Sequence, residues 1–458
     1  MISPARHAAH RVIRDVHTET YDLPQALDKH LASIVDSRDR GLATEIAIGT
    51  MRRRSTLDSF LAKFSSRDLD KLDRDVIDIL RGALYQLVYL DRIPRHAIVN
   101  DAVSMTRSLK KTSAAGFVNA ILRKCTKTSF VDGAPEKPKD HRENNFPRNP
   151  RENRHALEYL ATTHSHPSWI VKRLLDRYGF LATDRWCTFN NQPAPITLRV
   201  NTLKTDANTL TKKLEGYGIK TEPGRFSSNT LITIQGNPLT LDLFHEGWFL
   251  AQDEASQVIS ELMLVGPKDV ALDLCASPGG KTAAITGAMS NNGILVAADL
   301  RERRVSLLKQ TLSKLSVKNA RIVRLDGRKR LPFPAVFNWV LVDAPCSGLG
   351  TLRTNPDIRW RSSESQLTSF ASDQKALIAS GAEVVSPGGH LIYATCSSEP
   401  EENEHVVRSF LADHKNFEVD IPKNKSLSSL LSPEGFLHTL PHRDHLQAFF
   451  AAVLIRKR

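Results

Sequence analysis

The chain has 458 residues, of which 41% are hydrophobic and 25% charged, which is typical of a globular protein with two or three domains. No apolar run approaches the roughly 20 residues that a membrane-spanning helix needs, and the first residues carry His, Arg and Asp where a signal peptide has an apolar core. The formal charge of +13 is compatible with a polyanionic partner such as nucleic acid, and equally with a solvated surface of Lys and Arg.

The five cysteines lie far apart and include no C-x-x-C pair. This spacing argues against a structural zinc site and against a disulfide scaffold, and we expect no metal. For Cys125 and Cys187 the pattern predicts buried, inert thiols in a reducing cytoplasm, which is where we expect the protein to be located.

Residues 1–130 are predicted to form an all-α bundle. The clearest helix covers residues 72–90, where apolar side chains at spacings of three and four form one stripe: Leu72, Val76, Ile79, Ala83, Leu87 and Leu90. A further helix is expected after Pro94 and a short one over residues 114–125. Nothing in this part of the sequence indicates a strand.

Residues 131–154 have a different composition, with four prolines and alternating charges between 131 and 153. Such a segment buries too little apolar surface to offset its ordering entropy, so we predict a flexible linker.

Residues 155–250 are predicted to form a small α+β domain. A helix over 168–179 precedes a strand over 195–203, a helix over 206–218 and a second strand over 230–236.

From residue 251 to 458 the sequence repeats a strand, a turn and a helix. Units of this kind predict an α/β domain built on a mostly parallel, doubly wound sheet, which is a Rossmann-like architecture. Ligands of such sheets bind beyond the carboxyl ends of the strands, and the chemically unusual residues collect at those ends.

The first strand ends in the turn "DLCASPGGKT", residues 273–282. The ending "GKT" resembles a P-loop, but the glycine that a P-loop needs five residues before Gly280 is replaced by Cys275. Gly279 and Gly280 still allow the backbone to approach a ligand closely. The alternative is an ordinary strand-to-helix turn.

Three successive predicted strands end in a carboxylate: Asp273, Asp299 and Asp326. A carboxylate at the second strand end is the group that grips a ribose diol in nucleoside-binding sheets, and one at the third can accept from an adenine amino group. Together with the glycine turn, they predict a site for S-adenosyl-methionine.

The fourth predicted strand is followed by Asp343 and Cys346, and the fifth by Cys396. A thiolate that adds to C6 of a pyrimidine makes C5 nucleophilic, so that C5 can attack a methyl sulfonium. A carboxylic acid at N3 would stabilise the developing charge, and a base must then remove the C5 proton. The residues alone leave open which thiol attacks, and whether both are merely buried.

"DLCASPGGKT", "VDAPCSGLGTLRTNPDIRW" and "YATCSSEPEENE" resemble the RNA cytosine-5 methyltransferases of the NOL1/NOP2/Sun family over residues 155–458. "RGALYQLVYLDRIP", "HAIVNDAV" and "GFVNAILRK" resemble the NusB-type RNA-binding fold. Together they resemble the Sun/Fmu branch of that family, whose members methylate a cytosine in 16S rRNA. The resemblance implies a NusB-like bundle and, after a small α+β domain, a methyltransferase sheet.

The resemblance also implies roles for individual residues. Cys396 would be the nucleophile at C6, Cys346 would help to release the product, and Asp343 would lie between the cofactor and the base. Asp299 would bind the ribose of S-adenosyl-methionine and Asp326 its adenine region. Its methionine side would contact the first turn: Cys275, Ala276, Ser277, Pro278, Gly279, Gly280 and Lys281.

The sequence departs from the family pattern at two places. At another place it matches a family element that lies near the RNA. Ser277 stands where the family usually has alanine, and "LQAFF" at 446–450 replaces the common Asp-Gly-Phe-Phe. Arg199 and Asn201 match the family element near the RNA, and Gln252-Asp253 precede the first catalytic-domain helix.

The partner that the resemblance implies is 16S rRNA or an assembly intermediate of the small ribosomal subunit. We expect the protein to be a monomer and to bind no membrane. An alternative is cytosine-C5 methylation of tRNA or of another rRNA site. A second alternative is a non-catalytic RNA-binding assembly factor, which predicts loss of reactive residues, whereas Asp343, Cys346 and Cys396 are all present.

Overall fold

A computed structural model describes residues 2–128 and 150–458. Contacts divide the chain into two compact units, which are described separately here: Met1–Gln192 with Leu352–Ser362, and Pro193–Thr351 with Ser363–Arg458. Among the described residues, no helix is both long enough and apolar enough to cross a membrane.

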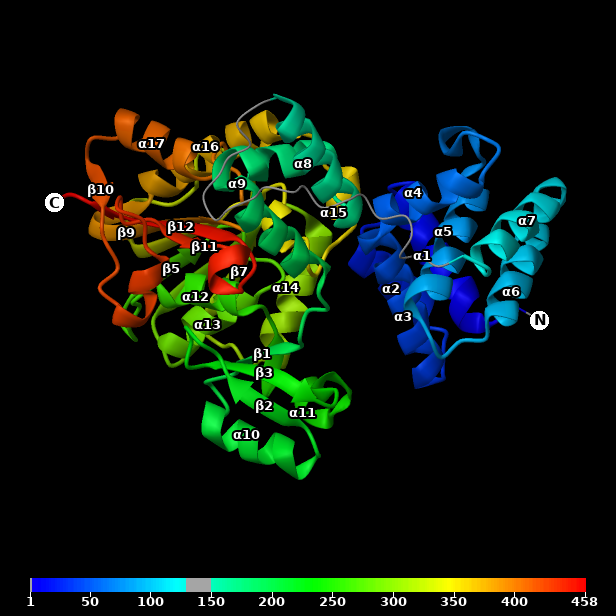
Figure 1. The fold of residues 1–458 in the computed structure, drawn as a ribbon. Coiled ribbons are helices and arrows are strands. Elements are labelled where there is room, and N and C mark those ends of the chain that lie inside the picture. Colours follow the sequence, from blue (N-terminus) through cyan, green and yellow to red (C-terminus); the bar gives the residue numbers. More distant parts are fainter. Residues whose placement is uncertain (1, 129–149) are drawn as a thin grey trace. The chain divides into compact units, whose positions relative to one another are not determined.

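The described part of the first unit is helical, as predicted for residues 1–130 (Figure 1). Its helices are α1 (Pro4–His17), α2 (Leu23–Leu31), α3 (Ser37–Arg52), α4 (Arg54–Phe64), α5 (Arg74–Tyr89), α6 (Arg95–Ser108), α7 (Ala115–Cys125), α8 (Pro150–Thr163), α9 (Ser168–Asn191) and α15 (Ile358–Arg361), with short 3₁₀ turns at Leu69–Lys71 and Thr112–Ala114.

Helix α5 forms the centre of the bundle, and its apolar stripe is the predicted one. Val76, Ile79, Ala83 and Leu87 are buried in one apolar cluster with side chains of α4, α6 and α7. The helix begins after Asp73, whose carboxylate accepts from the Asp75 amide at 3.0 Å and caps the first turn.

The predicted linker at 131–154 falls mostly on residues 131–149, which lie outside the described part of the chain. Its last residues were assigned wrongly, because α8 already begins at Pro150. Proline is well tolerated in the first turn of a helix, where its missing N–H needs no partner.

Helices α8 and α9 group with the first unit, whereas the sequence analysis joined residues 155–192 to the strands that follow. Hydrogen bonds join α8 and the turn that follows it to α4: Thr56 Oγ1 donates to the Thr162 carbonyl at 2.7 Å, and the Ser55 amide donates to Ser165 Oγ at 2.8 Å. Within α9, Gly179 has a φ of 74° at a kink, and the helix then continues to Asn191 beyond the predicted end.

The second unit begins with a small antiparallel sheet in the order β2-β3-β1-β4, with α10 packed alongside β2 and β3 (Figure 1). Its elements are β1 (Thr197–Val200), α10 (Ala207–Gly216), β2 (Lys220–Pro223), β3 (Thr230–Gln235), a 3₁₀ turn (Pro238–Thr240), α11 (Asp242–His245) and β4 (Phe249–Ala251). The predicted α+β character of this part is confirmed. Strands β2 and β4 were not foreseen, because β4 has only three residues and β2, with the sequence KTEP, has no hydrophobic residue that would indicate a strand.

The larger sheet has the order β10-β12-β9-β8-β5-β6-β7, with β11 paired to β12. Neighbours from β9 to β7 are parallel, and β12 is antiparallel to β9, so the mostly parallel Rossmann-like sheet is confirmed. The elements are α12 (Glu254–Glu261), β5 (Val270–Asp273), α13 (Gly280–Ala288), β6 (Ile294–Asp299), α14 (Glu302–Lys314), β7 (Ala320–Arg324), β8 (Phe337–Asp343), a 3₁₀ turn (Leu349–Thr351), α16 (Gln366–Glu383), β9 (Val385–Thr395), α17 (Glu404–Asp413), β10 (Phe417–Val419), a 3₁₀ segment (Lys425–Leu430), β11 (Leu437–Thr439), α18 (Pro441–Asp444) and β12 (Phe449–Arg456).

The strand order reverses between β5 and β8, which are adjacent in the sheet although β6 and β7 lie between them in the sequence. Loops that leave two such strands diverge to opposite sides and open a crevice at their carboxyl ends. The topology therefore puts the predicted site residues around one crevice.

Candidate active site

The two thiols lie side by side at the carboxyl ends of neighbouring strands. Sγ of Cys346, in the loop after β8, is 3.2 Å from Sγ of Cys396, in the loop after β9. This is a non-bonded distance, because a disulfide joins its sulfurs at about 2.05 Å, and both thiols are free. The sheet brings the loops together: the Ala344 amide donates to the Ala394 carbonyl at 2.8 Å.

The surroundings of Cys346 favour its protonated form. The hydrogen bond to Cys396, followed by burial, raises the pKa of the Cys346 thiol well above its ordinary value, and the charge of Glu402 adds to this rise. Cys346 is therefore a protonated thiol that shares its hydrogen bond with the sulfur of Cys396. Both cysteines are half-buried, so a substrate can reach them.

Asp343, the last residue of β8, forms an ion pair with Lys281. Lys281 Nζ donates to Asp343 Oδ2 at 2.6 Å, and its ammonium group lies 5.9 Å from the centre of the Phe449 ring. The lysine side chain is 11% exposed and the aspartate 28%. The first predicted turn thus supplies a cation to the carboxylate that precedes Cys346, a contact that sequence spacing did not reveal.

Glu402 is a residue that sequence reasoning missed. Its side chain is fully buried, and it accepts from the amide and hydroxyl of Ser347 and from the hydroxyl of Ser397. The segment "CSSEPEENE" indicated that such a residue could be present, since an acidic run so close to a thiol is unusual, but its three other carboxylates and two hydroxyls were equally plausible candidates.

The glycine turn after β5 packs closely against helix α14. Gly279 has a φ of 112°, which strongly favours glycine, and a Cβ added there would lie 3.0 Å from Leu308. Helix α13 begins at Gly280, so its first backbone N–H groups are available to a ligand above the turn. The crowding at Gly279 comes from α14, and the close approach of a ligand to this turn stays a prediction.

Asp273 is buried at the end of β5 and does not face the solvent. Its Oδ2 accepts from Thr282 Oγ1 at 2.7 Å, while Oδ1 has no hydrogen-bond partner in the described part of the chain. Burial, to which the neighbouring charges of Asp343 and Asp299 add, raises the pKa of Asp273 to about 7.

Asp299 ends β6 and already has polar contacts. It accepts from the Ser277 amide at 3.2 Å and from Arg304 Nε at 3.1 Å, and Arg304 also donates to the Ser277 carbonyl at 2.7 Å. Asp299 thus joins the glycine turn to the start of α14, and its side chain is 6% exposed.

Asp326 lies two residues beyond the end of β7 and is held by Arg328. Nε and Nη2 of Arg328 donate to its two carboxylate oxygens at 3.0 and 3.1 Å, and this pairing lowers the pKa of Asp326. Its side chain is 19% exposed, so one face of the carboxylate stays accessible.

Cys275, Ala276, Ser277 and Pro278 complete the turn between β5 and α13. Burial, followed by the charge of Asp273, raises the pKa of the Cys275 thiol far above its ordinary value, so this thiol stays protonated. The structure describes no hydrogen bond between Cys275 and the Cys346–Cys396 pair.

The segment "LQAFF", which departs from the family pattern, contacts the loop that follows Cys346 through its backbone. The Ala448 amide donates to the Gly350 carbonyl at 3.0 Å, and Gln447 Nε2 donates to Asp253, the N-cap residue of α12, at 2.8 Å. The hydrogen bond to Gly350 uses the backbone amide of residue 448, so it can form with alanine at this position as well as with the usual glycine.

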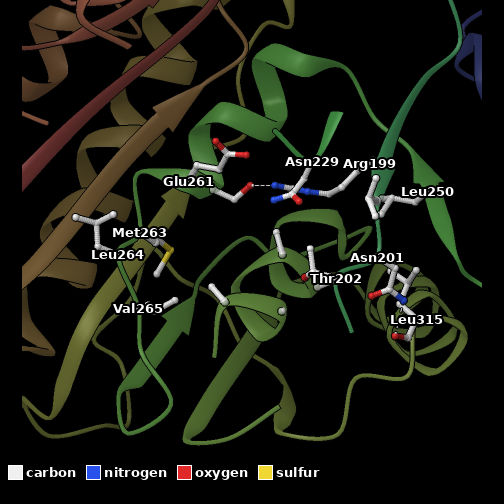
Figure 2. Close-up of a pocket in the computed structure, with 16 residues that line it drawn as sticks. Arg199, Asn201, Thr202, Asn229, Leu250, Glu261, Met263, Leu264, Val265 and Leu315 are labelled. Carbon is white, nitrogen blue, oxygen red and sulfur yellow. Dashed lines mark hydrogen bonds between the residues drawn. The ribbon is translucent and has the colours of Figure 1, made fainter. Parts of the chain in front are cut away.

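A cavity of about 410 Å³ lies away from the thiols, between the small sheet, α12 and α13, and Arg199 and Asn229 both line it (Figure 2). The Arg199 guanidinium donates to Gln252 Oε1 at 2.7 Å and to the Gly280 carbonyl at 3.2 Å. Asn201 Nδ2 donates to the carbonyls of Gly247 and Leu315. Both side chains are buried. Because Arg199 also donates to the Gln257 carbonyl at 3.2 Å, their hydrogen bonds join the small sheet to α12, to α13 and to the residue that follows α14.

Comparison with known proteins gives three family matches along the chain. Residues 262–455 match the family described as 16S rRNA methyltransferase RsmB/F. Residues 3–127 match the NusB family, and residues 166–240 match the ferredoxin-like domain of RsmF/B-like methyltransferases.

Relatives extend over nearly the whole chain. The protein is 32% identical to the "Probable ribosomal RNA small subunit methyltransferase B" of Bacillus subtilis, with 92% of each chain covered. It is 31% identical to the ribosomal RNA small subunit methyltransferase B of Pseudomonas putida, with 85% of this chain and 84% of that one covered. Among solved structures, PH0851 is 26% identical with a TM-score of 0.80, covering 100% of this chain and 99% of that one.

Proposed function

The chain belongs to the RsmB/F family of 16S rRNA methyltransferases, and we propose that it methylates C5 of one cytosine in 16S rRNA with S-adenosyl-methionine as the methyl donor. The observation that carries the proposal is the pair of thiols 3.2 Å apart beside the Lys281–Asp343 ion pair. A single thiol would suffice for addition to a pyrimidine, so a second at this distance suits a reaction that also needs a proton-handling group.

Cys396 is the nucleophile in this proposal. Its thiolate adds to C6 of the cytosine, which forms an S–C6 bond and places electron density on C5. After C5 is methylated, its proton is removed and the S–C6 bond breaks, which restores the aromatic ring. The C5 proton passes to a water molecule at the half-buried site, and Cys346, kept protonated by the hydrogen bond to Cys396 and by burial, donates its S–H to the Cys396 thiolate as that thiolate leaves C6.

Asp343 contacts the base. In its ion pair with Lys281, the carboxylate can accept from the N4 amino group of a cytosine, which a uracil lacks. The contact orients the ring over the thiols and discriminates between the two pyrimidines.

The residues of the crevice fit S-adenosyl-methionine. The glycine turn leads into the first backbone amides of α13, and Asp299 and Asp326 offer acceptors at the next two strand ends. Bound there, the cofactor supplies an electrophilic methyl sulfonium group. The turn, Cys275 to Lys281, would hold its methionine part, Asp299 its ribose and Asp326 its adenine.

The charge of +13 and the helical domain matched by the NusB family support an RNA substrate, as 16S rRNA or as an assembly intermediate of the small subunit. A monomeric state and a cytoplasmic location stay predictions.

Bisulfite sequencing of rRNA and tRNA tests the proposal, using cells with the intact gene, without it, and with a Cys396→Ala copy. We expect one 16S cytosine to lose its protection in the second and third strains. Loss of protection in tRNA or 23S rRNA would support the alternative substrate, and unchanged protection everywhere would contradict the proposed reaction.

A further inference from the structure

The carboxylate of Glu402 bridges the two loops that carry the thiols. Its Oε1 accepts from the Ser347 amide at 2.8 Å, and its Oε2 accepts from Ser347 Oγ at 2.5 Å and from Ser397 Oγ. Ser347 directly follows Cys346, and Ser397 directly follows Cys396. One side chain therefore binds the residue next to each thiol.

Glu402 is itself held from two further directions. Gln374 Nε2, from α16, donates to Glu402 Oε1 at 3.1 Å and to the Pro345 carbonyl at 3.0 Å, so it joins the carboxylate to the residue before Cys346. The hydroxyl of Tyr393, in β9, donates to the Glu402 carbonyl at 2.5 Å. The first contact restrains the carboxylate of Glu402 and the second restrains its backbone.

Full burial of a carboxylate costs free energy, because the group loses hydration that only hydrogen bonds or a cation can replace. Among the described residues, no Lys, Arg or His lies within ion-pair distance of Glu402, so its four hydrogen bonds have to meet this requirement. An apolar residue would fill the same space without that penalty, which indicates that the bridge itself is the reason for the carboxylate.

We propose that Glu402 is a positioning residue: through Ser347 and Ser397 it holds Cys346 and Cys396 at the separation that the two-thiol reaction needs. The inference rests on the proposed function, in which both thiols act on one pyrimidine. Loss of the bridge leaves each thiol present, with the loops joined only by backbone bonds such as Gly350 to Cys396 and by the contact between the hydroxyls of Ser347 and Ser397. The distance between the two sulfurs is then less constrained, and productive geometry tolerates displacements of only about 0.5 Å.

Thiol pairing can be measured without RNA or cofactor, which separates this inference from the proposed function. Diamide oxidises two adjacent thiols to a disulfide; the thiols lose two electrons and two protons, and the diamide is reduced to its hydrazine. Mass spectrometry of the peptides containing Cys346 and Cys396 gives the rate at which this disulfide forms, which we call the rate of closure. We expect Glu402→Ala to slow closure by about tenfold or more, since a disulfide tolerates little change in its geometry.

Glu402→Gln is the conservative variant, because its amide oxygen can still accept from Ser347 and Gln374 while its NH₂ donates to the serine hydroxyls. We expect closure within about threefold of the wild-type rate. Glu254→Ala is the matched control: Glu254 is another buried carboxylate of the same unit, and it accepts from the amides of Phe226 and Ser227. It should leave closure unchanged.

Methylation of 16S rRNA supplies the second readout. In Glu402→Ala we expect kcat to fall by about 100-fold with the KM for RNA and the Kd for S-adenosyl-methionine unchanged, because the loss is one of alignment. If Glu402→Ala does not fold, the double variant Ser347→Ala/Ser397→Ala removes the same bridge and should give the same two results.

Wild-type closure rates in folded Glu402→Ala or in the double serine variant would overturn the inference. An equal slowing in Glu254→Ala would also overturn it, since general destabilisation would then explain the effect. Absence of methylation by the wild-type protein would count against the proposed function, and the closure rates would still decide the role of Glu402.

Discussion

The Gly350 amide donates to the Cys396 carbonyl at 3.0 Å, so the chain that leaves one thiol is hydrogen-bonded to the peptide of the other. The Gly350 carbonyl in turn accepts from the Ala448 amide at 3.0 Å. Gly350 therefore lies between the Cys396 loop and the segment before β12.

A side chain at this position has no space. A Cβ on Gly350 would lie 1.9 Å from the Ala448 carbonyl oxygen and 2.7 Å from that of Cys396. Both obstacles are backbone atoms, so we expect Gly350→Ala to displace the Cys396 loop and lower kcat for methylation by about 100-fold. Gly216→Ala, where a Cβ meets no atom within 4 Å, is the control and should keep wild-type activity. Equal activity of the two variants would contradict the packing described here.

The two thiols are predicted to act in different steps. We expect Cys396→Ala to abolish methylation without an RNA adduct, because the nucleophile is gone, and Cys346→Ala to accumulate a covalent RNA adduct, because release fails. Incubation with 16S rRNA and S-adenosyl-methionine, followed by denaturing gel electrophoresis, detects the adduct. S-Adenosyl-methionine binding should be nearly intact in both variants.

An adduct in Cys396→Ala instead would reverse the two roles. Full activity in both variants would rule out covalent catalysis by this pair.

Asp273 should make the stability of the second unit depend on pH. Its pKa is about 7 in the folded protein against an ordinary value of 3.8. The folded state therefore retains the proton over this range, and the contribution of Asp273 to stability is fully present below pH 4 and is lost as the pH rises through 7. Asp273→Asn keeps an acceptor for Thr282 and removes the titration.

Urea unfolding at pH 5 and pH 8 measures the effect. We expect the wild-type protein to lose on the order of 1 to 3 kcal/mol more than Asp273→Asn between these two pH values. Parallel pH profiles for the two proteins would show that Asp273 does not titrate in this range.

Arg359 should be essential for the first unit. It is fully buried and donates to the carbonyls of Arg52, Ser165, Asn190 and Leu352 and to Asn191 Oδ1, and burial lowers its pKa to about 9. Arg359→Leu leaves these acceptors buried without their donor, so we expect a loss of roughly 3 kcal/mol in the free energy of unfolding.

Circular dichroism in urea checks this prediction. Lys172→Ala, which removes one partner of an ion pair whose side chains are 66% and 59% exposed, should change stability by less than about 1 kcal/mol. Equal effects of the two substitutions would contradict the role assigned to Arg359.

The sequence by itself determined the fold class, because hydrophobic periodicity is a local property. The stripe on α5 and the alternation of strands with helices in residues 251–458 reflect which side chains must leave water, and each can be read within one element. It also identified the strand ends that carry Asp273, Asp299 and Asp343, since an α/β unit ends its strand where the polar turn begins.

Only the tertiary structure decided which of these residues meet. Lys281 and Asp343 are 62 residues apart, and Ser347 and Glu402 are 55 apart, so their contacts depend on the order of strands in the sheet. Burial had the same non-local origin: Asp273 looked like a ligand-facing carboxylate in the sequence, and its enclosure by neighbouring elements raises its pKa to about 7. Hydrogen bonding and dielectric surroundings are set by residues distant in the chain, and for this reason the bridging role of Glu402 became visible only in the folded molecule.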